Sequence, residues 1–318
     1  MNKRIGILLV SVLLSVLVCF SLSSCSKQAE EIICTDCFYS FTDSLGNEVV
    51  LPEKPQRVAV LFSSLCNVWE NAGGEAVITV GESVERGFCG EDALLVDSGA
   101  GKSINTELLI SYKPDLVIYS SDVPAQKQTG ELLEKAGIPS AGIRLDSFDD
   151  YLSALKIFCD ITGNPDRYVT NGESIKEKVD SRIEGARKLR EEPKILFIRS
   201  GSSQSSCKAK KSDDNFAAKM LEELGCINIA DSAPVLLDGL SVEEVLMNKP
   251  EFIFVSIMGD EQAGKAYMEG VFSSDAWKSL DSTVIYLPKE LFQYKPCEKW
   301  NAAYDYLAEI LYPVLFTN

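Results

Sequence analysis

The sequence of 318 residues contains no histidine. Histidine is the commonest transition-metal ligand among side chains and the commonest general base in enzymes. Its absence excludes a Ser–His–Asp triad and any zinc site that depends on imidazole ligands. We therefore predict no catalytic residues, no resident metal and no cofactor.

Positive charge is also scarce, because 31 Lys and Arg residues stand against 47 Asp and Glu residues. Nucleic acids and anionic lipid surfaces attract basic proteins and repel acidic ones. This balance argues against nucleic acid as a partner and against broad electrostatic adhesion to a membrane.

The ten cysteines lack a regular spacing. The single C-x-x-C, at Cys34 and Cys37, has no strand-like run before it, whereas a thioredoxin motif needs one. One such motif also cannot complete a zinc site with four ligands. We expect this pair to form a local disulfide or to remain as thiols.

An uncharged apolar run covers residues 5–22, after a basic start that contains Lys3 and Arg4. The pattern is typical of a secretory signal, and the run is also long enough for a transmembrane anchor. The sequence LSSC, which ends at Cys25, resembles a lipobox, in which the cysteine is lipidated and becomes the mature N-terminus. We predict a signal peptide at 1–24, a lipidated Cys25, a spacer at 25–37 and a protein body outside the cytoplasm, anchored to the cell membrane.

Short apolar runs alternate with helical patterns along the rest of the chain. The strand candidates lie in a hairpin at 38–52 and at 57–62, 76–80, 116–120, 140–144, 194–200, 252–257 and 283–287. The helix candidates lie at 125–137, 148–163, 165–192, 215–225, 263–280 and 297–313. Strands that alternate with helices indicate parallel sheets. We predict an α/β fold with one lobe at 38–148, a helical bridge at 149–192 and a second lobe at 193–318.

One segment occurs twice, once in each lobe. INTELLISYKPDLVIYSS at 104–121 matches LSVEEVLMNKPEFIFVSI at 240–257, and the match pairs Glu107 with Glu243 and Lys113 with Lys249. Each copy predicts a helix, a turn at a proline and a buried strand. A duplicated fold element explains most of the match.

Ligands of open α/β sheets bind beyond the carboxyl ends of the strands. At those ends the sequence places polar, basic and aromatic side chains that we predict to line a cleft: Ser63, Ser64, Trp69, Arg86, Ser121, Arg144, Arg199, Lys208, Lys289 and Tyr294. Arginine offers a planar fork that suits carboxylates. We therefore predict a cleft that accepts an anion, although loops also carry charge for solvation alone and aromatic residues beside strands also serve as core.

Several segments together resemble one family. They are FTDSLGNEVVLPEKPQRVAVL after the lipobox, KPDLVI, DITGNPDRY in the bridge and KPCEKWNAAYDYLAEILYP at the end. The chain resembles the solute-binding lipoproteins of ATP-binding-cassette importers for ferric siderophores, haem and cobalamin. The resemblance implies two Rossmann-like lobes joined by a single long helix, with the ligand cleft between the lobes.

The resemblance also implies partners. They are a small-molecule ligand, and a permease dimer with its cytoplasmic ATPase, on which one exposed glutamate of each lobe docks. In this sequence those positions fall on Glu107 and Glu243. A glutamate near the start of a helix is also favoured by the helix dipole, and Ser241 with Glu244 has the pattern of a capping box.

The expected ligand is a small anionic iron chelate, a ferric siderophore, with cobalamin and haem as alternatives. An alternative of another class is an exported thiol or Ser/Lys enzyme that uses Cys66, Cys89 or Cys207 in the cleft. No base other than lysine stands beside these residues in the sequence, so we predict a binding protein and not an enzyme.

Overall fold

The computed structural model describes residues 37–97 and 103–317 of the chain. The predicted signal peptide at 1–24, the lipidated Cys25 and the predicted spacer up to residue 36 lie outside the described residues. None of the helices within the described ranges is both long enough and apolar enough to cross a membrane.

The first element is the predicted hairpin, formed by β1 (Tyr39–Thr42) and β2 (Glu48–Leu51), which pair antiparallel. The carboxylate of Asp43 accepts hydrogen bonds from the backbone N–H groups of Leu45 and Asn47, at 2.9 and 2.8 Å. Asp43 also accepts the N–H of Gly142 in the first sheet, at 2.9 Å. One side chain thus both shapes the turn and ties the hairpin to the sheet.

A five-stranded parallel sheet forms the first lobe, in the order β5-β4-β3-β6-β7. Its strands are β3 (Val58–Val60), β4 (Ile78–Thr79), β5 (Leu94–Leu95), β6 (Leu116–Ser120) and β7 (Ser140–Ile143). Its helices are α2 (Ser63–Asn71), α3 (Gly81–Glu85), α4 (Thr106–Ser111) and α5 (Pro124–Lys135). The edge strand β5 was not predicted, because two exposed leucines carry no pattern of burial.

The second lobe repeats this topology, with the parallel order β10-β8-β11-β12 in place of β4-β3-β6-β7. Its strands are β8 (Lys194–Ser200), β9 (Lys208–Ala209, antiparallel to β8), β10 (Ile227–Asn228), β11 (Phe252–Ile257) and β12 (Thr283–Tyr286). Its helices are α9 (Phe216–Glu223), α10 (Val235–Asp238), α11 (Val242–Asn248), α12 (Glu261–Phe272), α13 (Asp275–Lys278) and α14 (Lys289–Phe292). The α/β fold of two Rossmann-like lobes is therefore confirmed.

Helices connect the two sheets without an intervening strand. α6 (Phe148–Thr162) ends at Gly163, whose left-handed φ of 77° stops the helix. α7 (Pro165–Tyr168), a π-helical turn at Val169–Glu173 and α8 (Ser174–Leu189) then follow one another directly, with right-handed junctions. The predicted long connecting helix is thus present, with one π-helical turn inside it.

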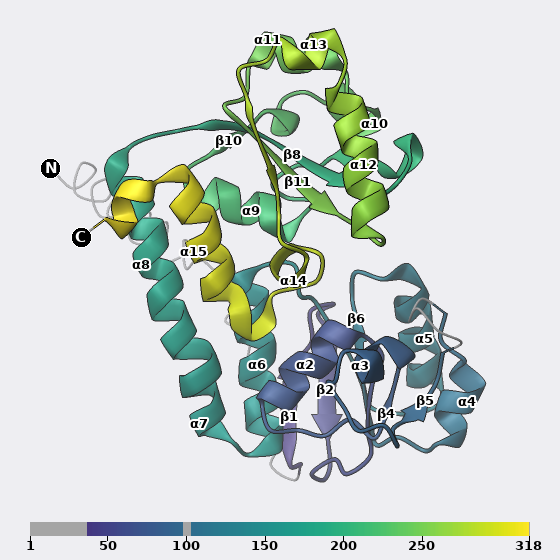
Figure 1. Cartoon of the computed structure of the whole chain (residues 1–318). Coiled ribbons are helices and arrows are strands. Elements are labelled where there is room, and N and C mark those ends of the chain that lie inside the picture. The colour runs from purple at the N-terminus through teal and green to yellow at the C-terminus, as the bar shows by residue number, and fades with distance from the viewer. Residues whose placement is uncertain (1–36, 98–102, 318) are drawn as a thin grey trace, which may run out of the picture. The chain divides into compact units, whose positions relative to one another are not determined.

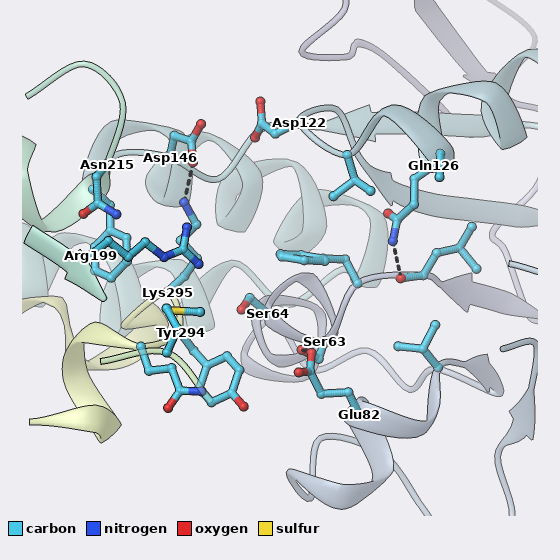
Figure 2. Close-up of a pocket in the computed structure, with 18 of the residues that line it drawn as sticks. Ser63, Ser64, Glu82, Asp122, Gln126, Asp146, Arg199, Asn215, Tyr294 and Lys295 are labelled. Carbon is cyan, nitrogen blue, oxygen red and sulfur yellow. Dashed lines mark hydrogen bonds and ion pairs between the residues drawn. The ribbon is translucent and has the colours of Figure 1, made fainter. Parts of the chain in front are cut away.

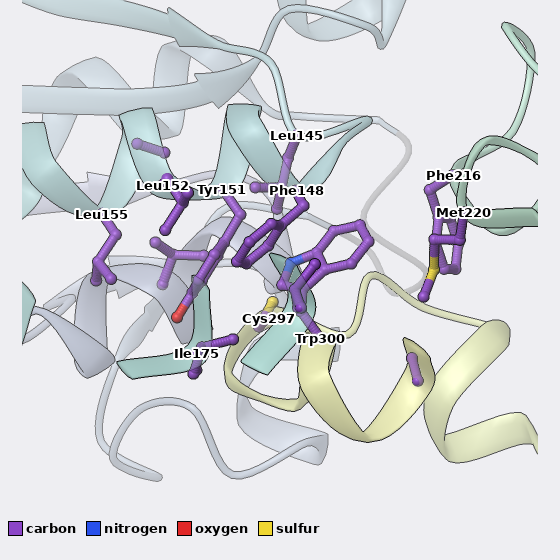
Figure 3. Close-up of a cluster of buried hydrophobic side chains, with 14 of the residues drawn as sticks. Leu145, Phe148, Tyr151, Leu152, Leu155, Ile175, Phe216, Met220, Cys297 and Trp300 are labelled. Atoms are coloured by element: carbon purple, nitrogen blue, oxygen red, sulfur yellow. The ribbon is translucent and has the colours of Figure 1, made fainter. Parts of the chain in front are cut away.

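The closing helix α15 (Trp300–Leu311) lies beside α8 (Figure 1), and Arg182 of α8 pairs with Asp305 of α15 at 2.5 Å. Aromatic rings pack at the other end of α15 (Figure 3). Trp300 contacts Phe148 of α6 at a centroid distance of 5.7 Å and Phe216 of α9 at 5.9 Å. Because close-packed rings resist sliding, this cluster fixes the bridge against the second lobe.

The repeated segments adopt the same backbone. Lys113 and Lys249 have φ angles of 53° and 49°, each directly before a proline. Asp115 accepts the backbone N–H of Arg57 at 2.9 Å, and Glu251 accepts the backbone N–H of Lys194 at 3.2 Å. In both lobes the acidic residue after the Lys-Pro turn therefore fixes the start of the neighbouring strand.

Candidate functional site

A cavity of about 700 Å³ lies at the carboxyl ends of the strands of both sheets. The first lobe lines it with residues 61–64 after β3, Val80 and Glu82 after β4, residues 122–126 after β6, and Asp146 after β7. The second lobe lines it with Arg199 of β8, residues 214–216, Met258 after β11 and residues 292–295, which begin at the last residue of α14. Open α/β sheets bind ligands at this position, so this cavity is the candidate ligand site.

Four of the predicted cleft residues line the cavity: Ser63, Ser64, Arg199 and Tyr294. Arg86 reaches its wall, because Nη1 donates to Ser63 Oγ at 2.8 Å. The structure thus brings together half of the ten residues that the strand ends suggested.

The other five residues do not line this cavity: Trp69, Ser121, Arg144, Lys208 and Lys289. Trp69 is core, with its ring edge-on to Phe158 at 5.4 Å, and Ser121 is buried. Arg144 lines a separate, smaller hollow, where its Nε lies 3.6 Å from Asp150 Oδ2.

Lys208 belongs to the strand β9, and the ammonium of Lys289 lies 3.5 Å from the carbonyl oxygen of Gly259. A position at a strand end fixes where the backbone lies. The direction of a long side chain depends on its neighbours.

One wall of the cavity is a network of polar side chains. Ser63, the first residue of α2, donates its hydroxyl hydrogen to the carboxylate of Glu82 in α3, and Figure 2 shows these two side chains together. Ser63 also accepts a hydrogen bond from Arg86. The Arg86 guanidinium lies over the Tyr294 ring at 4.0 Å and over the Phe88 ring at 4.6 Å. This network holds a carboxylate and two aromatic rings in fixed positions beside the cavity.

The segment after α14 ties the second lobe to the first. Lys295 forms an ion pair with Asp146, drawn as a dashed line in Figure 2. The Cys297 thiol donates to the carbonyl oxygen of Ser64 at 3.5 Å, and Asn71 Nδ2 donates to Glu298 Oε2 at 3.1 Å. Side-chain contacts beside the cavity therefore join the two lobes.

Arg199 is different from the other charged groups of the cavity. No side chain within the described ranges hydrogen-bonds or ion-pairs with its guanidinium, and burial lowers the pKa of this group. A partly desolvated cation without a counter-ion favours an anion in its place. The cavity therefore offers one prepared position for an acidic group.

The charge of the lining as a whole is more acidic than the basic residues at the strand ends suggested. Its cations are Arg199 and Lys295, and its carboxylates are Glu82, Asp122, Asp146 and Asp214. Burial raises the pKa of Asp122 and Asp146 raises it further, against the opposing effects of Lys295 and Arg144. Among the lining residues that the structure describes, Lys295 is already paired with Asp146, so Arg199 is the cation left to attract an anion.

Sequence reasoning missed several lining residues, among them Gln126, Asp146, Phe216 and Lys295. Gln126 donates to the carbonyl oxygen of Leu61 at 2.7 Å and accepts from the N–H of Ser120 at 2.8 Å, so it joins the ends of β3 and β6. Asn215 caps α9 and so places Phe216 at the cavity. The capping residue Asn215 was the sequence signal that could have indicated the position of Phe216.

Glu107 and Glu243 are both exposed in the first turns of α4 and α11. The side chain of the N-cap residue, Asn105 in α4 and Ser241 in α11, accepts a hydrogen bond from a backbone N–H of its helix. The predicted capping box is only half formed, because the Glu244 carboxylate accepts the Asn248 amide at 2.8 Å instead. Glu243 keeps its carboxylate at the surface, with one hydrogen bond from the Ser241 hydroxyl at 3.1 Å.

Comparison with known proteins agrees with this geometry. A family model described as periplasmic binding protein matches residues 58–285. A search of curated proteins found no match.

Several solved structures share the fold. The apo periplasmic heme-binding protein RhuT from Roseiflexus sp. RS-1 is 17% identical, with a TM-score of 0.63 over 81% of this chain and 98% of that chain. SirA of Staphylococcus aureus, complexed with staphyloferrin B, is 18% identical, with a TM-score of 0.64 over 88% of this chain and 99% of that chain. IsdE of S. aureus, complexed with heme, is 14% identical, with a TM-score of 0.63 over 80% and 98%. Identities this low establish the fold alone.

Proposed function

Because the chain belongs to the periplasmic binding protein family, we propose that it captures a ferric siderophore outside the cytoplasm and delivers it to the permease of an ATP-binding-cassette importer. Cys25 carries the lipid that holds it at the cell membrane. The protein performs no covalent chemistry in this role.

The unpaired Arg199 guanidinium carries the ligand assignment. A chelate with an acidic group on one side can place that group against Arg199. The acidic group then neutralises the charge of the partly desolvated guanidinium. Four aromatic residues, Phe62, Phe216, Phe292 and Tyr294, supply apolar surface for the body of the ligand. The similar structure of SirA with staphyloferrin B supports this class of cargo.

Haem is the second candidate, and Tyr294 favours it. Its ring lines the cavity, and tyrosine oxygen is a known axial ligand of haem iron. In that case Arg199 would pair with a haem propionate. Two of the similar structures named above, RhuT and IsdE, are of a heme-binding protein and of a complex with heme. Cobalamin is a further alternative on account of the aromatic lining.

The docking role belongs to Glu107 and Glu243. Both carboxylates are exposed, and both occupy the same place in the duplicated helix–turn–strand unit. A permease made of two similar subunits would meet two similar carboxylates, one on each lobe, and would bind them through basic side chains.

A thermal-shift and native mass spectrometry screen tests the ligand class. The full chain is mixed with carboxylate, hydroxamate and catecholate ferric siderophores, haem and cobalamin. A ligand that binds only the native state at 100 times its Kd raises the free energy of unfolding by about 2.7 kcal/mol. We expect a ferric siderophore to give this stabilisation and the matching complex mass.

Stabilisation by haem alone, with a Soret band that changes in Tyr294→Phe, would replace the siderophore with haem as cargo. Turnover of a screened compound that stops when the thiols are blocked would instead identify an enzyme.

A further inference from the structure

Cys66 and Cys89 meet behind the polar wall of the cavity. Cys66 lies in α2 and is fully buried, whereas Cys89 follows α3 and is partly exposed. Cys66 Sγ lies 3.4 Å from the carbonyl oxygen of Phe88, the residue directly before Cys89. Cys89 and Phe88 both pack against the buried cluster that contains Cys66, and each of the two thiols shifts the pKa of the other. Two sulfur atoms that are 23 positions apart in the sequence are therefore neighbours.

The two thiols are chemically unequal. The contact with Cys89 and burial both raise the pKa of the Cys66 thiol. The interaction with Cys66 lowers the pKa of Cys89, against the opposing effects of burial and the charge of Glu70. Cys89 is also the thiol that solvent reaches. A reactive cysteine combines thiolate character with access, so Cys89 suits attack and Cys66 suits resolution.

We propose that Cys66 and Cys89 are a covalent modification site, at which a small-molecule disulfide such as glutathione disulfide oxidises the pair to an intramolecular disulfide.

The oxidation proceeds by two successive thiol–disulfide exchange steps. The Cys89 thiolate attacks one sulfur of glutathione disulfide, which forms a mixed disulfide and releases one glutathione thiolate. The Cys66 sulfur then attacks the Cys89 sulfur, breaks the mixed disulfide and expels the second glutathione. The proton of Cys66 passes to the departing thiolate. Two protein thiols lose two electrons, and one glutathione disulfide becomes two glutathione molecules.

The disulfide would join two pieces of the cavity wall. α2 begins with Ser63 and Ser64, which line the cavity, and the loop before Cys89 carries Arg86 and Phe88. At present Arg86 holds Ser63 through a hydrogen bond of 2.8 Å. A covalent link behind this contact would restrict the opening of the wall whatever the cargo.

Peptide mapping of the full-length protein tests the site. The reduced protein is incubated with glutathione disulfide, quenched with acid, alkylated and digested. We expect the native mass to fall by two hydrogen atoms, one cross-linked peptide pair with Cys66 and Cys89, and recovery with dithiothreitol. Cys89 should react at least about tenfold faster than a buried thiol such as Cys226.

Single variants separate the roles. In Cys66→Ser the reaction should stop at glutathione on Cys89, and in Cys89→Ser Cys66 should stay reduced. Cys226→Ser, which removes another buried thiol, should behave as the wild type. The wild-type map decides the proposal even where a variant fails to fold. A wild type that keeps both thiols, or that links either one to a third cysteine, overturns the proposal, as does Cys66→Ser without an adduct on Cys89.

Discussion

The Arg86 guanidinium lies 4.0 Å from the ring centroid of Tyr294. Arg86 belongs to the first lobe and also donates to Ser63, whereas Tyr294 belongs to the segment that follows α14 in the second lobe. Both Ser63 and Tyr294 line the cavity. One cation therefore connects the two lobes at the point where the ligand would bind.

Removal of this contact should weaken the protein measurably. We expect Tyr294→Leu to lower the free energy of unfolding by about 0.5–1 kcal/mol, because Arg86 loses the ring face. Tyr294→Phe keeps the ring and should have little effect. Urea unfolding of Arg86→Met, Tyr294→Leu and the double variant gives the coupling energy. A coupling energy of zero would show that the two side chains are only neighbours.

Charge reversal tests the docking role. Glu107→Lys and Glu243→Lys together should reduce uptake of the cargo by about tenfold or more, because two attractive contacts with the permease become repulsive. The affinity of the purified protein for its cargo should stay unchanged, since both residues lie outside the cavity lining.

Glu261→Lys is the matched control, because Glu261 is also an exposed glutamate in the first turn of a helix, α12. Normal uptake by the double variant would remove Glu107 and Glu243 from the docking surface. Equal loss with Glu261→Lys would indicate a general effect of charge.

Arg199 should dominate the affinity for an acidic cargo. Arg199→Gln removes the unpaired cation of the cavity and should weaken binding on the order of 30-fold, or about 2 kcal/mol. Arg144→Gln removes an arginine that lies outside this cavity and should leave the affinity within about twofold of the wild type. Isothermal titration of both variants measures the difference. Equal affinities would place the acidic group of the cargo elsewhere.

The fold was more predictable from the sequence than the site. Both lobes, the hairpin and the bridge follow from apolar runs, turn residues and the duplicated segment. Lys113 and Lys249 show why the duplication was informative, because each stands just after its helix in a left-handed conformation and directly before a proline. Helix ends and turns of this kind depend on residues that are close in the sequence, so they can be predicted without the tertiary structure.

The cavity lining depends on side-chain directions instead. Arg144 turns toward Asp150, although it follows a strand of the first sheet as predicted. Lys295 reaches Asp146 across 149 positions, and no pattern near either residue indicates that contact. Contacts between distant segments arise only when both lobes are packed. The strand ends therefore indicated the position of the cavity, but half of the residues predicted to line it lie elsewhere.

Glu223 gives a prediction on pH and stability. Its carboxyl group is partly buried in α9 and accepts the Tyr304 hydroxyl hydrogen of α15. Burial raises the pKa of Glu223 above its ordinary value of 4.5, and the hydrogen bond from Tyr304 and the charge of Lys219 offset only part of this effect. The folded protein therefore holds the proton more tightly than the unfolded chain does.

This difference in proton affinity determines how the contribution of Glu223 to stability changes with pH. Below about pH 4.5 the carboxyl is protonated in both states and its contribution to stability is complete, and that contribution is lost as the pH rises through the folded pKa. Glu223→Gln mimics the protonated group and should be more stable than the wild type at neutral pH.

Urea unfolding between about pH 4.5 and 7.5 should show the advantage of Glu223→Gln growing with pH. Glu177→Gln, at an exposed position of α8, should show no such growth. A constant difference between Glu223→Gln and the wild type across this range would mean that the carboxyl titrates alike in the folded and unfolded states.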